Sequence, residues 1–174
     1  MNPKDEVKFE DIRKLVNASL EKFYKNDRDL IEIAEDRDMI SERCMVFHIG
    51  AYMKNKMGTL MKFQWADLDC EYNRDVQMPK RMVREEKSDS IIPDLIIHRR
   101  GSDKNNLLVI EFKKESAWAE EKEKDREKLM YLTNQEERFK YNFGLYIELG
   151  RHEVHVDVYQ EGNLQTKLNY TITY

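Results

Sequence analysis

The sequence has few of the residues that form disulfides or interrupt regular structure. Of its 174 residues, two are cysteine, three are proline and six are glycine. Two cysteines are too few for a disulfide framework, so we expect a reducing, cytoplasmic compartment. No apolar run approaches the roughly 18 residues that span a bilayer, and the first residues lack the apolar core of a signal peptide. These absences argue against a secreted disulfide-rich protein and predict no membrane partner.

An excess of basic charge is also absent. The chain has 30 lysines and arginines against 34 aspartates and glutamates, a formal net charge of -4. Proteins that bind nucleic acid through simple electrostatics are usually basic, so this balance argues mildly against that class. It is compatible with an acidic site that holds cations, because a bound metal reverses the local field. Neither common pattern of glycine-rich phosphate loop is present.

Hydrophobic residues, at 40% of the chain, suffice for the core of a single domain. Apolar residues recur at helical spacing over residues 6–24, and again from about 38–41 to 56. Residues 27–38 are charged and we interpret them as a connector. The apolar residues of the first helix are Phe9, Ile12, Leu15, Val16, Leu20 and Phe23, and those of the second are Val46, Ile49, Met53 and Met57.

The second half of the chain has the pattern of strands around one helix. The predicted strands cover residues 62–72, 91–98, 107–112, 141–149, 154–158 and 164–174. Residues 73–90 are expected to be a polar connection, and 116–137 a solvated helix. The turn-forming segment 100–106 predicts that the strands on either side of it form a hairpin. The whole order predicts a mixed α/β domain.

Two carboxylates and a lysine fall on neighbouring strands of that predicted hairpin. Asp94 follows Pro93 at the start of one strand, and Glu111 and Lys113 lie near the end of the next. Side chains two residues apart share a face of a strand, so Glu111 and Lys113 project the same way. Pairing of the strands would bring Asp94 beside Glu111. Adjacent carboxylates repel each other unless a cation joins them, and oxygen ligands suit Mg²⁺ or Mn²⁺.

Pro93-Asp94 and Glu111-Phe112-Lys113, with sixteen residues between the two acidic positions, resemble the motif of the PD-(D/E)xK nuclease superfamily. The resemblance implies a restriction-endonuclease-like core of a helix, three antiparallel strands, a helix and a fourth strand. That core corresponds to residues 38–149, with 1–37 as an N-terminal helical extension and 150–174 as a C-terminal β-hairpin. Three passages are similar to those of uncharacterised bacterial members: residues 70–74, 98–101 and 125–129.

The resemblance also implies an activity and its site residues. Members are Mg²⁺- or Mn²⁺-dependent nucleases, so we expect hydrolysis of DNA phosphodiester bonds through a metal-activated water. Lys113 would position the attacking water. Glu42 matches an acidic residue that members often carry on the first core helix, four residues before Val46 on the inward-facing stripe. The implied metal ligands are Asp94, Glu111, the carbonyl of Phe112 and Glu42.

Basic and histidine side chains near the motif are candidates for nucleic-acid contacts. Positive groups on loops beside an acidic metal centre suit phosphate anchoring. Acidic residues are interspersed among them, so a solvated loop is an equal interpretation. His98 can equally be an ordinary polar strand end, and Lys128 a member of a surface ion pair. The candidates are Arg74, His98, Arg99, Arg100 and Lys128.

Simpler interpretations of the motif also remain open. In one, Glu111 and Lys113 form the exposed polar face of an edge strand, Asp94 is a turn residue, and Glu42 is a solvated helix carboxylate. In another, a nuclease-like fold serves as a binding or assembly module without catalytic activity. The chain leaves little room for a separate recognition domain, so a partner protein could supply specificity. The exposed edge of the C-terminal hairpin, with its tyrosine and isoleucine face, favours a homodimer.

Overall fold

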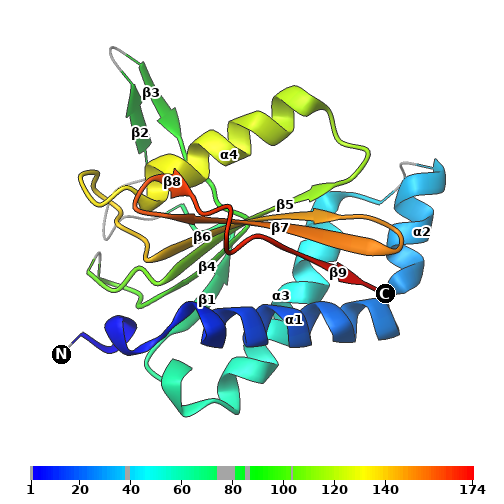
Figure 1. Ribbon diagram of the computed structural model, residues 1–174, viewed down its shortest axis with the longest axis horizontal. Helices are drawn as coiled ribbons and strands as arrows, with labels where there is room; N and C mark the ends of the chain where they lie inside the picture. Colours follow the sequence, from blue (N-terminus) through cyan, green and yellow to red (C-terminus); the bar gives the residue numbers. More distant parts are fainter. Residues whose placement is uncertain (1, 38–39, 74–80, 85–86, 103) are drawn as a thin grey trace.

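The computed structural model shows helices on both sides of one sheet (Figure 1). It describes residues 2–37, 40–73, 81–84, 87–102 and 104–174. The helices are η1 (Pro3–Glu6), α1 (Phe9–Asn26), α2 (Arg28–Arg37), α3 (Glu42–Gly58), η2 (Met61–Phe63) and α4 (Ala119–Thr133). The strands are β1 (Asp67–Cys70), β2 (Arg81–Arg84), β3 (Lys87–Ser90), β4 (Leu95–His98), β5 (Leu108–Lys114), β6 (Phe143–Leu149), β7 (Glu153–Gln160), β8 (Asn163–Leu164) and β9 (Tyr170–Thr173).

The main sheet has seven strands, in the order β1-β4-β5-β6-β7-β8, with β9 also paired to β7. Strands β5 and β6 run parallel and are joined through α4, whereas the other pairs are antiparallel. Strands β2 and β3 form a separate antiparallel hairpin. The sheet is therefore mixed and mostly antiparallel, and β5 lies between two neighbours in its interior.

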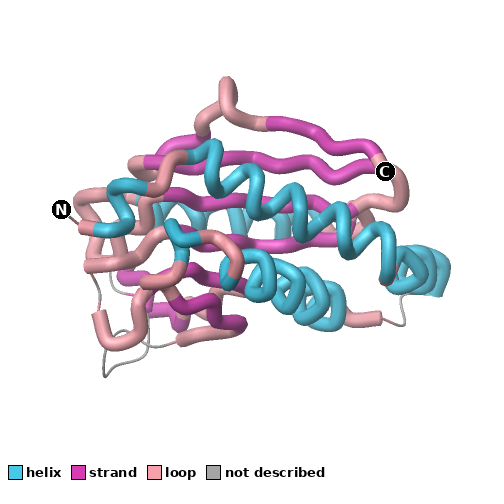
Figure 2. The backbone as a smooth tube through the Cα atoms, turned by 90° about the horizontal axis from the view of Figure 1, so that it is seen from below, coloured by secondary structure: helices cyan, strands magenta, loops and turns pink. Residues whose placement is uncertain are grey.

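The two faces of the sheet are covered by different helices. Helices α1 and α3 contribute to the larger hydrophobic cluster, together with alternate residues of β4 to β7. Helix α4 packs on the opposite face through Leu129 and Leu132. Figure 2 shows the strands side by side with helices laid across them. The result is a layer of sheet between two layers of helix, each buried on its apolar side.

The apolar spacing predicted the two long N-terminal helices correctly. All six apolar residues of the 6–24 pattern are in α1, and all but Phe9 are fully buried. The four residues of the second stripe are buried in α3. A helix with one apolar face gains stability when a sheet covers that face, which is why these two patterns were reliable.

Four sequence-based expectations about secondary structure are wrong. Residues 62–72 are not one strand, because 61–63 form the helical turn η2 and β1 covers only 67–70. Residues 27–38 are not a connector, because 28–37 form α2, whose Ile31 is buried in the main core. The polar segment 73–90 contains the β2–β3 hairpin. The final strand is shorter than 164–174, because a turn separates β8 from β9. In each case a pairing or packing contact distant from the local pattern decides the structure.

The C-terminal hairpin is present, with β7 and β8 joined by a tight turn at Glu161 and Gly162. Both turn residues have positive φ, 52° and 75°, as a twisted two-residue hairpin turn requires. Its tyrosine and isoleucine face packs against the main core, and the ring of Tyr174 stacks on Tyr24 of α1 at 4.1 Å. The surface predicted to need a partner is thus partly covered within the same chain, at Tyr174 by α1, and the homodimer stays a prediction.

Among the described helices, none combines the length and the apolar character needed to cross a bilayer.

Candidate functional site

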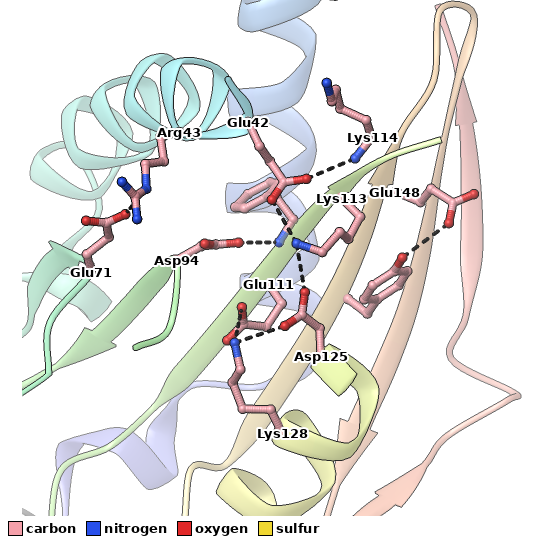
Figure 3. Close-up of polar contacts among 12 residues, drawn as sticks. Glu42, Arg43, Glu71, Asp94, Glu111, Lys113, Lys114, Asp125, Lys128 and Glu148 are labelled. Atoms are coloured by element: carbon pink, nitrogen blue, oxygen red, sulfur yellow. Dashed lines mark hydrogen bonds and ion pairs between the residues drawn. The ribbon is translucent and has the colours of Figure 1, made fainter. Parts of the chain in front are cut away.

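The predicted hairpin of β4 and β5 forms and brings Asp94 next to Glu111. Leu95 is opposite Ile110, so Asp94, one residue earlier, lies opposite Glu111. Strand β4 begins at Leu95, which leaves the backbone N–H of Phe112 without a partner strand at that level. The Asp94 carboxylate takes its place: the Phe112 N–H donates to Asp94 Oδ2 at 2.7 Å (Figure 3). The carboxylate therefore continues the hydrogen-bond ladder one residue before the start of β4.

Glu42, the first residue of α3, reaches the same end of β5. Lys113 Nζ donates to Glu42 Oε1 at 2.8 Å, and the backbone N–H of Lys114 donates to Glu42 Oε2 at 3.2 Å. Both carboxylate oxygens of Glu42 are thus held by β5 (Figure 3). The interpretation of Glu42 as a solvated helix carboxylate is wrong.

Helix α4 completes the cluster with Asp125 and Lys128, which are three residues apart on one helical face. Lys128 Nζ lies 2.9 Å from Glu111 Oε2 and 2.9 Å from Asp125 Oδ1. Asp125 Oδ2 lies 3.0 Å from Lys113 Nζ. Carboxylates and ammonium groups therefore alternate from Glu42 to Glu111 through Lys113, Asp125 and Lys128 (Figure 3). We call these five side chains and Asp94 the acidic cluster.

Burial sets the electrostatics of the two central carboxylates. Glu111 is 1% exposed, and its desolvation raises its pKa well above the ordinary value, although the Lys128 charge opposes this. Burial raises the pKa of Asp94 from 3.8 to about 6, with the nearby Glu42 charge adding to the rise and the Phe112 N–H opposing it. Both carboxylates are thus destabilised in their charged form, as expected for acids desolvated next to like charges.

The two lysines of the acidic cluster respond in the opposite direction. Burial lowers the pKa of Lys113, but its hydrogen bond to Glu42 and the charge of Asp125 outweigh burial and leave the pKa above its ordinary value. The pKa of Lys128 is likewise raised, because Glu111 and Asp125 outweigh its burial. Both side chains are therefore ammonium groups at neutral pH, and neither is suited to take a proton from water.

The acidic cluster contains oxygen atoms of the kind that hard divalent cations bind. Glu111 Oε1 is buried and has no hydrogen-bond partner among the described residues, so one carboxylate lone pair is unused. The N–H and C=O of one strand residue face the same neighbour, so the Phe112 carbonyl is on the Asp94 side of β5. Carboxylate and carbonyl oxygens are the ligands of Mg²⁺ and Mn²⁺. Within the described residues, however, no three His, Cys, Asp or Glu side chains already form a metal-binding group.

Two clefts open on either side of the acidic cluster. One, of about 220 Å³, is lined by Asp94, Cys70 and residues of α3 that include Arg43 and Phe47. The other, of about 620 Å³, lies between α4 and the base of the β2–β3 hairpin and reaches Lys128. Asp94 therefore borders one cleft and Lys128 the other.

The predicted nucleic-acid residues are dispersed. His98 is 3% exposed and its Nε2 lies 2.9 Å from Asp69 Oδ2, four residues or about 13 Å along β4 from Asp94. Arg100 pairs with the same Asp69 carboxylate and is half exposed. Arg99 is exposed, and Lys128 is part of the acidic cluster. Arg74 lies outside the described residues.

The structure differs from the sequence-based predictions at β5 and at Asp125. The interpretation of β5 as an exposed edge strand is wrong, because β4 and β6 flank it and Glu111 is buried. Asp125 was not among the predicted site residues, although it holds both lysines. Its position three residues before Lys128, on the face that also carries Leu129, was the available signal.

Comparison with known proteins adds no relative: no protein-family model, curated protein or solved structure matches the chain.

Proposed function

We propose that the chain is a Mg²⁺- or Mn²⁺-dependent nuclease that hydrolyses DNA phosphodiester bonds, built on a restriction-endonuclease-like core. The observation that carries the proposal is the convergence of Asp94, Glu111 and Lys113 at one end of β4 and β5. Once the separate β2–β3 hairpin is set aside, the element order α3-β1-β4-β5-α4-β6, with three antiparallel strands and a parallel fourth, supports it. It is the order expected of that core.

In this proposal Asp94, Glu111 and the Phe112 carbonyl hold the cation, and Glu42 supports the site. When bound, the cation would supply Lewis-acid polarisation of a phosphoryl oxygen and would acidify water. Lys113 remains an ammonium group and orients water or donates to a phosphate oxygen, because Glu42 and Asp125 keep it protonated. Exposed Arg99, on the β4–β5 loop, is a candidate for contact with a more distant phosphate.

One observation favours a second candidate, a binding or assembly module without catalytic activity. The charges of Glu42, Glu111 and Asp125 are each met by a lysine in the structure. A closed ion-pair network of this kind can hold α3, β5 and α4 together without a cation. In that case the acidic cluster is a structural junction and the surface of the chain carries the function.

Cleavage of DNA tests the first candidate. Purified protein is incubated with plasmid and with single-stranded DNA, in Mg²⁺, in Mn²⁺ and in chelator. We expect metal-dependent cleavage that Asp94→Asn and Glu111→Gln abolish, and that Lys113→Met slows by roughly 10²–10³-fold, the range for one preorganised electrostatic group. Glu123→Gln is the matched control, because Glu123 is exposed on α4 outside the cluster. Equal behaviour of wild type and Asp94→Asn in all conditions would contradict catalysis at this site.

Calorimetric titration with Mn²⁺ separates the two candidates. The nuclease proposal expects binding that Glu111→Gln weakens by more than about tenfold. The module expects no binding that depends on Glu111. Light scattering over a range of protein concentrations then shows whether the chain assembles with itself, as the module requires if no other partner is present.

A further inference from the structure

Lys128 makes a contact that the proposed chemistry does not require. It reaches from α4 across to β5, where Nζ lies 2.9 Å from Glu111 Oε2. Glu111 is the most deeply buried carboxylate of the acidic cluster, and this ammonium group is the cation nearest to it among the described residues. Lys128 thus neutralises the carboxylate that the proposed function assigns to a divalent cation.

Asp125 is a second carboxylate partner of Lys128. Its Oδ1 lies 2.9 Å from the same Nζ, so the ammonium group bridges the two carboxylates. Both residues are on α4, one turn apart, whereas Glu111 belongs to the sheet. A small rotation of the lysine side chain can end the contact with Glu111 while the contact with Asp125 persists, because the second contact lies within one element.

We propose that Lys128 is a built-in competitor of the divalent cation for Glu111, and that Asp125 retains it when the cation binds. This inference rests on the cation site of the proposed function. Lys128 carries one positive charge, so a divalent cation displaces it from Glu111, whereas a monovalent ion does not gain enough to do so. The pair Lys128 and Asp125 therefore sets the cation concentration at which the site fills.

The geometry assigns Asp125 a second, positioning role. Its other oxygen, Oδ2, lies 3.0 Å from Lys113 Nζ. As Lys128 leaves Glu111 for Asp125, the Asp125 carboxylate still holds Lys113 beside Glu42. The exchange of cations at Glu111 thus leaves the position of Lys113 unchanged.

Mn²⁺ titration by calorimetry, without DNA, tests the competition. Lys128→Met removes the competing charge and keeps the aliphatic chain, so we expect Mn²⁺ to bind roughly tenfold or more tightly than to wild type. Lys124→Met is the matched control: Lys124 is exposed on α4 one turn earlier and lines the same cleft. It loses the same charge, and we expect its affinity to stay within about twofold of wild type because solvent screens it. Equal affinities for Lys128→Met and wild type overturn the inference, as does a weaker affinity.

Asp125→Asn should change the Mn²⁺ affinity in the opposite direction to Lys128→Met. Without Asp125 the lysine is held by Glu111 alone, so we expect Mn²⁺ affinity to fall by roughly tenfold. In the double variant Lys128→Met and Asp125→Asn no competitor is left, and the Asp125 change then has a much smaller effect. If Asp125→Asn lowers the Mn²⁺ affinity equally in wild type and in Lys128→Met, the loss of the Asp125 charge acts directly on the cation. That result would overturn the retention of Lys128 by Asp125.

Thermal unfolding in chelator gives a readout without metal. Because Lys128 neutralises a buried carboxylate, we expect Lys128→Met to melt at a lower temperature than wild type, and the added change Glu111→Gln to restore the melting temperature. Mn²⁺ should then raise the melting temperature of Lys128→Met more than that of wild type.

The outcomes also separate this inference from the proposed function. If wild type and Lys128→Met both fail to bind Mn²⁺, the cation site is wrong and the inference falls with it. If wild type binds Mn²⁺ and Lys128→Met binds it no more tightly, only the inference falls. If Mn²⁺ binds as expected but DNA is not cleaved, the competition stands and the nuclease proposal fails.

Discussion

The two faces of β5 differ in what they contribute to the protein. Ile110 and Phe112 point into the apolar cluster beneath α1 and α3 and are fully buried there. Glu111 and Lys113, on the other face, belong to the acidic cluster under α4. Burial of an Ile or Phe side chain stabilises a fold by about 1.5–3 kcal/mol, whereas burial of a carboxylate opposes folding unless it is paired. Side chains on one face of β5 therefore stabilise the sheet. Side chains on its other face carry charges that are unfavourably desolvated.

The largest expected effect belongs to the apolar face. Ile110→Ala leaves a cavity among fully buried side chains, so we expect a loss of about 2–5 kcal/mol in the free energy of unfolding. Chemical denaturation measures it. Mn²⁺ affinity of the folded variant should match wild type, because the side chain faces away from Glu111. A loss below about 1 kcal/mol would show that β5 is not packed as described.

A pH effect distinguishes the charged face. The pKa of Asp94 is raised from 3.8 to about 6 in the folded state. The fold thus favours the protonated form, and the stability that this gives is present below pH 3.8 and is lost as pH rises through 6. In chelator, we expect wild type to lose about 2 kcal/mol relative to Asp94→Asn between pH 4 and 7.

Urea unfolding of both proteins across this pH range measures the difference. The control is Glu123→Gln, whose exposed carboxylate should give no such divergence from wild type. Parallel curves for wild type and Asp94→Asn would show that Asp94 is not desolvated. Mn²⁺ affinity should rise with pH through the same range, because the cation binds the ionised carboxylate.

Glu111→Gln should separate stability from cation binding. The raised pKa of Glu111 means that its charged form is unfavourable in the fold, and Lys128 keeps Asp125 as a partner after the change. In chelator at neutral pH we expect the variant to be more stable than wild type, because the amide removes the desolvated charge. Saturating Mn²⁺ should reverse the order, because only wild type gains binding energy. Denaturation with and without Mn²⁺ measures the free energy of unfolding in each state. If the variant is less stable than wild type in chelator, the charged form of Glu111 is not unfavourable in the fold.

The smallest effect is expected at the rim of the site. Arg43 pairs with Glu71 at 2.6 Å, but its side chain is 81% exposed. Exposed pairs contribute about 0–1 kcal/mol, so Arg43→Ala should change the free energy of unfolding by less than about 1 kcal/mol. The same denaturation assay measures it. A larger loss would mean that the pair contributes to the fold rather than only to the cleft beside Asp94.

The spacing of apolar residues correctly predicted the helices and strands that bury one apolar face in the core. The stripe of α1 and the alternating valines of β7, Val154, Val156 and Val158, are buried as expected. The pairing of β4 with β5 and the position of Asp94 beside Glu111 also followed from the sequence, because a turn between two apolar strands fixes their register.

Other parts could not be predicted in this way. Helix α2 has a charged sequence and depends on contacts such as that of Ile31 with the core. The role of Asp125 depends on how α4 is placed over β5, which no local period encodes. Strand pairing and helix docking involve residues far apart in the chain, so their outcome is set by packing rather than by neighbouring residues.

The sequence alone determined the mixed α/β class, the positions of α1 and α3, and the pair of acidic residues on adjacent strands. Each of these follows from spacing along the backbone, where side-chain direction has a fixed period. Only the tertiary structure decided that β5 lies inside the sheet, that Glu42 and Asp125 reach the same lysine, and that Lys128 neutralises Glu111. These contacts join α3, β5 and α4. Because the charged groups are buried where the three elements meet, they interact more strongly than they would in water.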